Sequence, residues 1–434
     1  MPRHPFASRP PADSVPRPFA ERFNRVIVAG MLVLAGNVAW AESWSGYRGG
    51  RGDGISAETF SSASSAPKLT VRWKTDAPLG FSSLAVDDSL AVTLVGRDGR
   101  EVALALDSSD GKERWAAVLG PAQYDGGGGN AGAPGNRGGD GPRSTPAIDG
   151  DRVYVYDAHL KLWCLDAASG AVVWTVDVAA DHQGRNIKWS NASSPVIDDG
   201  RVFVSGGGAG QSFLCIDAAT GQIVWSAGDE AMTHSTPTVA TIEGVRQVIF
   251  WMQSGLVSLA TDDGRPLWRT KYPFSVSTAA SPVVVGNQVY CSAGYGVGAG
   301  LFEIDADQSV REVWFEPNQL MNHWSTPVAK GGNLYGIFGF KKYARAPLQC
   351  VDLQSGQTRW SERGYGPGNA ILVGDRLVVL SDAGDLVIVA ADPSGYRELA
   401  RENVLDGKCW STPAFADGAI YVRSTEQAAR IDVR

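Results

Sequence analysis

Short runs in which apolar and polar residues alternate, each followed by a turn, recur along most of this chain. One such unit has runs at residues 145–148, 152–156, 161–165 and 171–174, with Asp and Gly in the turns between them. Alternation with a period of two over about four to eight residues is typical of half-buried β-strands. The pattern therefore predicts an all-β chain in which four short strands make one unit.

A phrase of constant spacing marks the end of each unit. Asp is followed by Gly four positions later, and Gly is followed by Trp after another four positions. Complete copies contain Asp107, Asp166, Asp217 and Asp352 and end at Trp115, Trp174, Trp225 and Trp360, and degraded copies end at Trp268 and Trp314. Because an Asp carboxylate accepts backbone N–H groups and Gly tolerates a positive φ, the phrase predicts a tight turn before the last strand. The Trp is expected to be buried between neighbouring units.

A second phrase, Ser or Thr followed by Pro, precedes the first strand of most units. Pro146, Pro195, Pro237, Pro282 and Pro327 lie 42 to 49 residues apart, a period that is typical of propeller blades. With the degenerate copies included, the units begin at Leu84, Pro146, Pro195, Pro237, Pro282, Pro327, Ala370 and Pro413. The sequence thus predicts an eight-bladed β-propeller of four-stranded antiparallel blades.

The last unit lacks a fourth strand and its Trp. Residues 69–75, which include Trp73, have the pattern of a fourth strand that has no preceding partners. We expect this N-terminal strand to complete the C-terminal blade, because closure of the ring removes the open sheet edges that favour aggregation. Residues 69–434 are then a single domain, since each blade leans on the next.

The first 41 residues have a different character. Arg17, Arg22 and Arg25 precede an apolar run at 26–39, which ends in Ala39-Trp40-Ala41. This order is typical of a signal peptide that is cleaved after Ala41. An uncleaved anchor is the alternative, although a bilayer span needs about 20 apolar residues. We expect residues 1–41 to be a signal peptide, residues 42–68 an N-terminal extension, and the mature protein to be periplasmic or secreted.

Charge limits the classes of partner. The chain has a formal net charge of −7, and residues 1–41 contain five basic and two acidic residues, so the mature chain would carry −10. A surplus of acidic groups disfavours nucleic acid and anionic lipid as partners. We expect no stable membrane insertion, and we expect a monomer.

The five cysteines are not expected to form disulfides. Cys164, Cys215 and Cys350 occupy the same position in three units, where the first unit has Ala105, so burial of a small side chain explains them. Equivalent positions in different blades are too far apart to be bridged, because the Cα atoms of a disulfide lie within about 7 Å of each other.

Polar and aromatic residues precede the first strand of several units. In a propeller these loops meet at one end of the central channel. The candidate ligand-binding residues of this mouth are Arg143, Lys188, Trp189, Asn191, His234, His323, Trp324, Asn369 and Trp410, and Lys408 lies beside them. Trp faces would stack on a planar ligand, and the cations and imidazoles would contact anions or carbonyls. Alternatively, these side chains plug the channel.

Two features near this mouth leave alternatives open. His234 and His323 are either structural histidines held by hydrogen bonds or, with less support, ligands of a metal ion, for which no third ligand stands out. The Gly-rich segment at 120–143 is either a lid over the channel or a simple insertion. No metal site is predicted.

The repeated phrase resembles the tryptophan-docking repeat of the pyrroloquinoline quinone (PQQ) propellers, a family that includes PQQ-dependent dehydrogenases and the BamB-type assembly lipoprotein. The resemblance covers residues 69–434. Segments at 44–56, 244–248, 322–327, 364–368 and 395–410 are also similar to PQQ-like propeller proteins of planctomycetes and related bacteria. The resemblance implies the propeller fold but not one function, because the family contains both enzymes and scaffolds.

Three functions compete on this basis. The favoured one is an exported, non-enzymatic scaffold without a cofactor, which binds an envelope protein or a small polar ligand through the channel face. The alternative is a PQQ-dependent dehydrogenase with calcium. Such enzymes usually have a vicinal Cys pair, Glu, Asn and Asp calcium ligands and a catalytic Asp; this chain has no vicinal Cys pair and no position that matches the calcium set. A hydrolase or lyase is the least favoured, because no catalytic dyad is visible.

Overall fold

The computed structural model of this chain describes residues 43–60, 66–123, 141–339 and 346–434. The chain divides into two compact units, residues 1–40 and residues 41–434, and all described residues belong to the second. The expected signal peptide and cleavage site lie outside the described residues, as do residues 124–140 of the Gly-rich segment. Where the structure is described, no helix has both the length and the apolar character that a membrane span requires.

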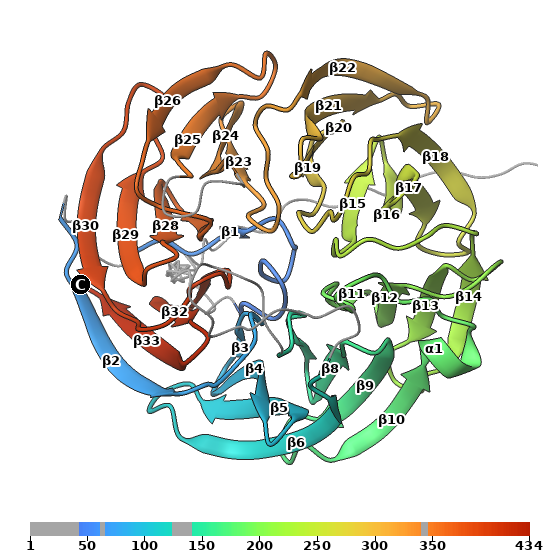
Figure 1. The fold of residues 1–434 in the computed structure, drawn as a ribbon, viewed down its shortest axis with the longest axis horizontal. Helices are drawn as coiled ribbons and strands as arrows, with labels where there is room; N and C mark the ends of the chain where they lie inside the picture. Colours follow the sequence, from blue (N-terminus) through green and yellow to red (C-terminus); the bar gives the residue numbers. More distant parts are fainter. Residues whose placement is uncertain (1–42, 61–65, 124–140, 340–345) are drawn as a thin grey trace, which may run out of the picture. The chain divides into compact units, whose positions relative to one another are not determined.

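Eight sheets surround a central channel, so the predicted eight-bladed β-propeller is confirmed (Figure 1). Strands 1 to 4 of each blade follow one another from the channel to the rim and pair antiparallel. The one α-helix of the described residues, α1 (Val178–Asp181), follows a rim strand.

The blades have these bounds. Blade 1 is β3 (Ala85–Asp87), β4 (Leu90–Arg97), β5 (Arg100–Asp107) and β6 (Glu113–Pro121). Blade 2 is β7 (Ala147–Asp149), β8 (Arg152–Tyr156), β9 (Lys161–Asp166) and β10 (Val172–Asp177). Blade 3 is β11 (Val196–Asp198), β12 (Arg201–Ser205), β13 (Phe213–Asp217) and β14 (Ile223–Ala227). Blade 4 is β15 (Thr238–Ile242), β16 (Val245–Met252), β17 (Gly255–Ala260) and β18 (Pro266–Lys271).

The second half of the ring repeats this plan. Blade 5 is β19 (Val283–Val285), β20 (Gln288–Ala293), β21 (Gly298–Ile304) and β22 (Val310–Pro317). Blade 6 is β23 (Val328–Lys330), β24 (Asn333–Ile337), β25 (Leu348–Asp352) and β26 (Thr358–Glu362). Blade 7 is β27 (Asn369–Val373), β28 (Arg376–Leu380), β29 (Asp385–Ala390) and β30 (Glu398–Asn403). Blade 8 is β31 (Ala414–Ala416), β32 (Ala419–Arg423), β33 (Gln427–Val433) and β2 (Leu69–Asp76).

The Asp and Gly of the repeated phrase form the turn that the sequence predicts. In blade 3 the Asp217 carboxylate accepts the backbone N–H of Thr220 at 2.8 Å, and Gly221 has a φ of 75°. A Cβ at Gly221 would lie 2.8 Å from the ring of Trp174 in the preceding blade. Only Gly therefore allows both the turn and the close approach of the indole.

Trp residues of the phrase join one blade to the next at six of the eight junctions. The indole Nε1 donates to a turn carbonyl of the following blade in six pairs: Trp73 to Ser108, Trp115 to Ala167, Trp174 to Ala218, Trp225 to Thr261, Trp314 to Leu353 and Trp360 to Asp392, at 2.8 to 3.1 Å. The rings are buried or half-buried. The predicted burial of Trp between blades is therefore confirmed, and each contact adds a hydrogen bond to apolar packing.

Trp268 departs from this arrangement. Its Nε1 donates at 2.6 Å to the side-chain oxygen of Gln247 in its own blade. The turn of the following blade, blade 5, also contains a residue with a positive φ, but this residue is Gln308, with a φ of 65°, where blade 3 has Gly221. The degraded phrase of blade 5 thus coincides with a changed hydrogen-bond partner for the Trp that precedes it.

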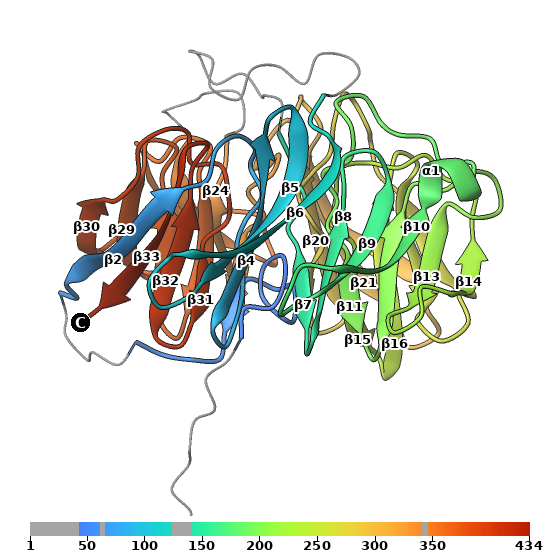
Figure 2. The ribbon, with the colours of Figure 1, turned by 90° about the horizontal axis from the view of Figure 1, so that it is seen from below.

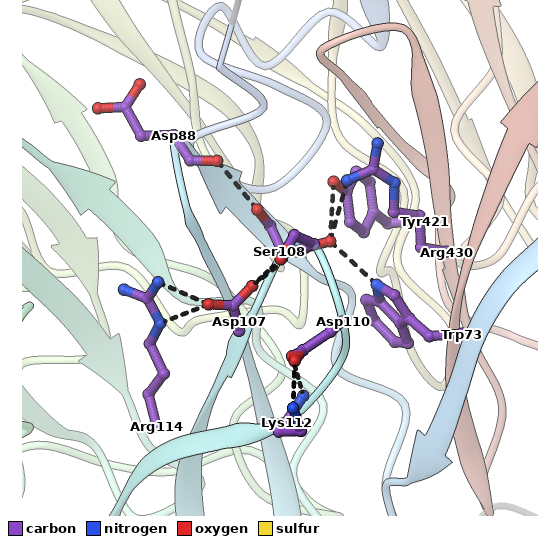
Figure 3. A network of polar contacts seen from close by, with 10 residues as sticks. Trp73, Asp88, Asp107, Ser108, Asp110, Lys112, Arg114, Tyr421 and Arg430 are labelled. Atoms are coloured by element: carbon purple, nitrogen blue, oxygen red, sulfur yellow. Dashed lines mark hydrogen bonds and ion pairs between the residues drawn. The ribbon is translucent and has the colours of Figure 1, made fainter.

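The N-terminal strand closes the ring as predicted. β2 pairs antiparallel with β33, and Trp73 lies opposite Arg430. The backbones of Lys68 and Arg434 exchange hydrogen bonds of 2.7 and 3.0 Å next to this pair. Figure 3 shows the seam with blade 1, where the indole of Trp73 and the guanidinium of Arg430 both donate to the carbonyl oxygen of Ser108.

A buried arginine reinforces the same seam. Arg423, at the end of β32, is 0% exposed. Its guanidinium donates to the hydroxyl of Thr93 at 2.9 Å and to carbonyl oxygens that include those of Leu79 and Leu94. Burial lowers its pKa to about 9, so the group remains charged at neutral pH. Blade 8 is thereby fixed to the loop and second strand that begin blade 1.

Residues 43–60, which we call the arm, begin in the channel and leave it past the turns of blades 7 and 8. Trp44 exchanges backbone hydrogen bonds with Val86 of β3, and the carbonyl of Ser45 accepts from the N–H of Ile148 in β7. β1 (Ile55–Ser56) then pairs parallel with β27 and makes blade 7 five-stranded. The arm is the blue loop at the centre of the ring in Figure 1, and Figure 2 places it in the lower half.

All five cysteines are buried and free, in agreement with the prediction of no disulfide. Cys164, Cys215 and Cys350 each lie opposite the Trp of their own blade in the strand register. Their shared position is therefore explained by packing.

Candidate functional site

The Ser/Thr-Pro phrase brings the candidate residues together at one end of the channel. Six innermost strands begin just after this phrase, and those of blades 1 and 7 begin at its degenerate copies, so the loops before them lie on one face and the turns after them lie on the opposite face. We call these the aromatic face and the arm face. The aromatic face is defined by Phe81, Trp189, His234, Tyr295, His323, Trp324 and Trp410.

Hydroxyl groups of the phrase form a belt beneath the aromatic face. At five of the eight junctions the backbone N–H of one blade donates to the hydroxyl of the next: Ser83 to Thr145, Thr145 to Ser194, Ser194 to Thr236, Ser281 to Thr326 and Thr412 to Ser83, at 2.8 to 3.1 Å. All of these residues are buried. The phrase therefore joins the blades near the axis, a role that sequence reasoning missed although the repeat itself was the signal.

Three aromatic rings stack above this belt. The ring centroids of Phe81 and Trp410 are 4.7 Å apart, and those of Trp410 and Trp324 are 4.6 Å apart. Trp410 is thus stacked against two other rings. The indole Nε1 of Trp324 also donates to the carbonyl of Pro367 at 2.8 Å. Sequence reasoning missed Phe81, although it holds the same place before Ser82-Ser83-Leu84 that Trp324 and Trp410 hold before Ser-Thr-Pro.

His323 continues this cluster. Its ring meets Trp324 edge-on at 4.9 Å and Tyr295 edge-on at 5.2 Å. Tyr295 comes from the turn between β20 and β21, which is not part of a repeated phrase, so no sequence signal pointed to it. Burial and the nearby His234 lower the pKa of His323 to about 3.

His234 has partners for both ring nitrogens. Nδ1 lies 2.8 Å from the hydroxyl of Ser277, and Nε2 lies 3.1 Å from the carbonyl of Lys188. Burial, and then the charge of Arg143, lower its pKa to about 4. Both imidazoles are therefore neutral at pH 7, and the ring of His234 is a hydrogen-bonded part of the wall.

Cations surround the aromatic rings. Lys188 Nζ lies 4.9 Å from the ring centre of Trp189, and Lys408 Nζ lies 5.5 Å from that of Trp410. Arg143 donates to the carbonyl of Trp189 at 2.6 Å. Burial lowers the pKa of Lys408. Cations over indole faces are favourable pairs that also leave the charge at the surface.

The two asparagines lie in the wall of the channel. Asn191 donates to the carbonyls of Tyr156 and Asp157 and accepts the N–H of Ser193. Asn369 takes the place of the Thr in blade 7 and donates to the carbonyl of Trp410 at 2.6 Å. Both are buried, and their side chains bind backbone groups of the wall.

The loops of this face contain bulky residues in the left-handed region. Trp189, Ser190 and Tyr295 have φ values of 72°, 63° and 57°. Such conformations are uncommon for residues other than Gly and persist only where the surroundings hold them. The rings of Trp189 and Tyr295 pack against His234 and His323, with ring centroids 6.4 and 5.2 Å apart.

A metal centre finds no support in these residues. Within the described ranges, no three His, Cys, Asp or Glu side chains lie close enough together to hold a metal ion. The charged groups that we place on the aromatic face are Arg143, Lys188 and Lys408, which would repel a divalent cation.

Comparisons with known proteins agree with the propeller fold. A family model described as outer membrane protein assembly factor BamB matches residues 98–362. A curated protein described in the same words, from Moranella endobia, is 25% identical over 67% of this chain, and the match spans only 60% of that relative.

Solved structures resemble the fold. The crystal structure of BamB from Moraxella catarrhalis superposes with a TM-score of 0.60 at 17% identity, covering 84% of this chain and 98% of that one. Quinohemoprotein alcohol dehydrogenase from Comamonas testosteroni has a TM-score of 0.62 at 13% identity, with 90% and 80% covered. At these identities the likeness concerns the fold alone.

Proposed function

We propose that this chain, which belongs to the family of the outer membrane protein assembly factor BamB, is an exported, non-enzymatic scaffold that binds an envelope protein through its aromatic face. The observation that carries the proposal is the stacked layer of Phe81, Trp410 and Trp324 with cations at its edge. Trp, Tyr and Arg are the residues that most often dominate binding energy in protein interfaces.

The construction of the face supports protein binding over small-molecule binding. The indoles cover one another, so a planar ligand would have to separate a formed stack before it could insert. A protein surface, in contrast, can cover the layer without opening it. Because the rings of Trp189 and Tyr295 already pack against those of His234 and His323, binding would cost little conformational freedom.

The histidines support a non-enzymatic role. A general base must exchange a proton near the working pH, whereas the pKa values of His234 and His323 are about 4 and 3. Both ring nitrogens of His234 already have hydrogen-bond partners. These two side chains therefore serve as neutral packing groups in the proposed scaffold.

The alternative of a PQQ-dependent dehydrogenase fits these residues poorly. PQQ with calcium needs oxygen ligands for the ion and a free planar surface for the quinone. The candidate residues offer Arg143, Lys188 and Lys408 in place of carboxylates, and Trp410 already stacks on Phe81 and Trp324. We therefore derive no redox step for this chain.

Site-directed photo-crosslinking tests the scaffold. A photoreactive amino acid replaces Lys188 on the aromatic face or, as a matched control, Lys271, an exposed lysine of β18 on the rim. In the native host, position 188 should give one discrete adduct with an envelope protein and position 271 should not. Identical adducts from both positions, or none from position 188, would contradict the proposal.

Two further measurements test its remaining parts. Mixing purified protein with PQQ and calcium chloride should leave no cofactor absorbance after desalting, and retained absorbance would favour the dehydrogenase. N-terminal sequencing of the protein from its native host should find Glu42 as the first residue. An intact segment at 26–39 would favour an anchor.

A further inference from the structure

A cavity of about 580 Å³ lies on the arm face, opposite the aromatic face. Its floor is the arm between Ser45 and Asp53, and its walls are the innermost strands of blades 2 to 5. A volume of this size is within the range of about 300–1,000 Å³ that is typical of ligand sites. Side chains at its edge are open to solvent, since those of Arg51 and Arg246 are 52% and 48% exposed.

The arm uses only part of the ring of strand edges that faces the channel. Apart from β27, which pairs with β1, each innermost strand is the last in its sheet, so one backbone edge has no neighbouring strand within the sheet. The arm pairs with these edges in blades 1, 2 and 7, through Trp44, Ser45 and Gly54. It reaches blade 6 through Arg48, which donates to the carbonyls of Thr326 and Pro327. Glu58 accepts from the turn of blade 8.

Blades 3, 4 and 5 receive no such contact from the arm. Among the described residues, no backbone hydrogen bond from another segment reaches the channel edges of β11, β15 and β19. These are the strands that line the cavity, together with β7. The cavity therefore presents three adjacent strand edges whose N–H and C=O groups remain available.

The chemistry of the lining indicates what such edges would bind. Val196, Val239 and Val284 supply apolar surface between the backbone groups. At the edge of the cavity Arg51 pairs with Asp53 and Arg246 with Asp198, and in both pairs the arginine is the more exposed side chain, at 52% against 35% and 48% against 20%. This combination favours an extended backbone that carries apolar side chains and an acidic group.

We propose that this cavity binds a short extended peptide segment of a partner protein, which adds a strand to the free edges of β11, β15 or β19. The arm is the intramolecular precedent, because it already adds β1 to β27 and pairs with β3 and β7 in the same ring. This site is independent of the aromatic face, so either one can fail without the other.

A defined pair of peptides tests the proposal. The probe is the fluorescein-labelled pentapeptide TVTVD with a free C-terminus, and the control is TPTPD, whose prolines cannot donate a backbone N–H to a strand edge. Fluorescence polarisation with the full mature chain should show saturable binding of TVTVD and at least about tenfold weaker binding of TPTPD. Equal binding of the two peptides, or no binding of TVTVD, would overturn the proposal.

Two substitutions locate the site. Ala240→Trp places an indole in the cavity, and Ala329→Trp is the matched control at the centre of β23, a half-buried innermost strand outside the cavity. Ala240→Trp should weaken TVTVD binding by about tenfold or more, whereas Ala329→Trp should leave it unchanged. Equal effects of the two would place the peptide elsewhere.

Amide hydrogen exchange on the unmodified protein gives a second measurement that does not depend on the folding of a variant. Bound TVTVD should slow exchange at residues 196–198, 238–242 or 283–285 and leave residues 328–330 unchanged. Protection that is absent from all three strands while polarisation still reports binding would also contradict strand addition.

Discussion

The indole Nε1 of Trp73 donates a hydrogen bond of 2.9 Å to the carbonyl oxygen of Ser108, across the seam at which the N-terminal strand meets the first blade. The two residues belong to different blades, and the same carbonyl also accepts from Arg430. The ring is thereby closed by the same Trp contact that joins most of the other blades, although here the strand that carries it is not continuous with the rest of its blade.

Replacement of Trp73 by Ala should lower the free energy of unfolding by about 3–5 kcal/mol, because it removes a buried ring and its hydrogen bond at the seam. Deletion of residues 69–75 should also expose the edge of β33 and cause aggregation. Urea unfolding and light scattering measure the two effects. A deletion variant that stays monomeric with an unchanged melting temperature would contradict the closure.

The contribution of the hydroxyl belt to stability should depend on the hydroxyl groups that accept its hydrogen bonds. Thr145→Val preserves the shape of the side chain but leaves the N–H of Ser83 without its acceptor, so it should lower the free energy of unfolding by about 1–3 kcal/mol. Thr145→Ser keeps the hydroxyl and is the control, with a smaller loss expected. Equal losses in the two variants would show that methyl packing, and not the hydrogen bond, matters at this position.

Stability should fall in acid because of the two buried imidazoles. Their pKa values in the folded protein, about 4 for His234 and about 3 for His323, lie below the value of about 6.5 in an unfolded chain. Between pH 6.5 and 4 the unfolded state binds protons that the folded state does not, so the free energy of unfolding decreases as the pH falls. For His234 the loss should approach about 3 kcal/mol at pH 4.

Urea unfolding of the wild type and of His234→Gln at pH 7 and pH 4.5 measures this contribution. At pH 7 the variant should be less stable than the wild type, because the hydrogen bonds of the imidazole with Ser277 and Lys188 are lost. Its free energy of unfolding should, however, depend less on pH. Parallel pH profiles of the two proteins would assign the acid sensitivity to other groups.

The arm should contribute to stability through Arg48, which is 1% exposed. Arg48→Met keeps an apolar stem but leaves the carbonyls of Thr326 and Pro327 without their donor, so a loss of about 3 kcal/mol is expected. Arg51→Met, which removes an arginine with an exposed side chain from the same segment, is the control and should cost less than about 1 kcal/mol. Thermal unfolding of both variants checks the difference.

Substitutions on the aromatic face and substitutions between blades should have different effects: the first should weaken partner binding, and the second should lower stability. Trp324→Ala should weaken the binding of a partner at this face by about 1–3 kcal/mol, the range for the loss of a stacked ring. Trp225→Ala should mainly cost stability, because its ring is buried between blades 3 and 4. Unchanged partner binding by the double variant His323→Ala and Trp324→Ala would place the functional surface elsewhere.

The repeated Asp, Gly and Trp, taken together with the Ser/Thr-Pro phrase, are sufficient to predict eight blades and the closing strand, because turn formation and burial of the indole depend on residues a few positions apart and on a neighbour of the same kind. The convergence of Trp324, His323 and Trp410 also followed from the repeat, since equivalent loops must lie at the same end of the channel. Phe81 was predictable in the same way, from its place before the first blade.

Contacts between positions that are far apart and do not repeat were decided only by the tertiary structure. Arg48 meets a carbonyl 278 residues away, and Arg423 meets one 329 residues away. No local pattern distinguishes these two arginines from the exposed ones, because a guanidinium in the sequence does not reveal which backbone carbonyls the ring will place around it. The same holds for the path of the arm through the channel, which leaves the strand edges of three blades open and so creates the cavity on the arm face.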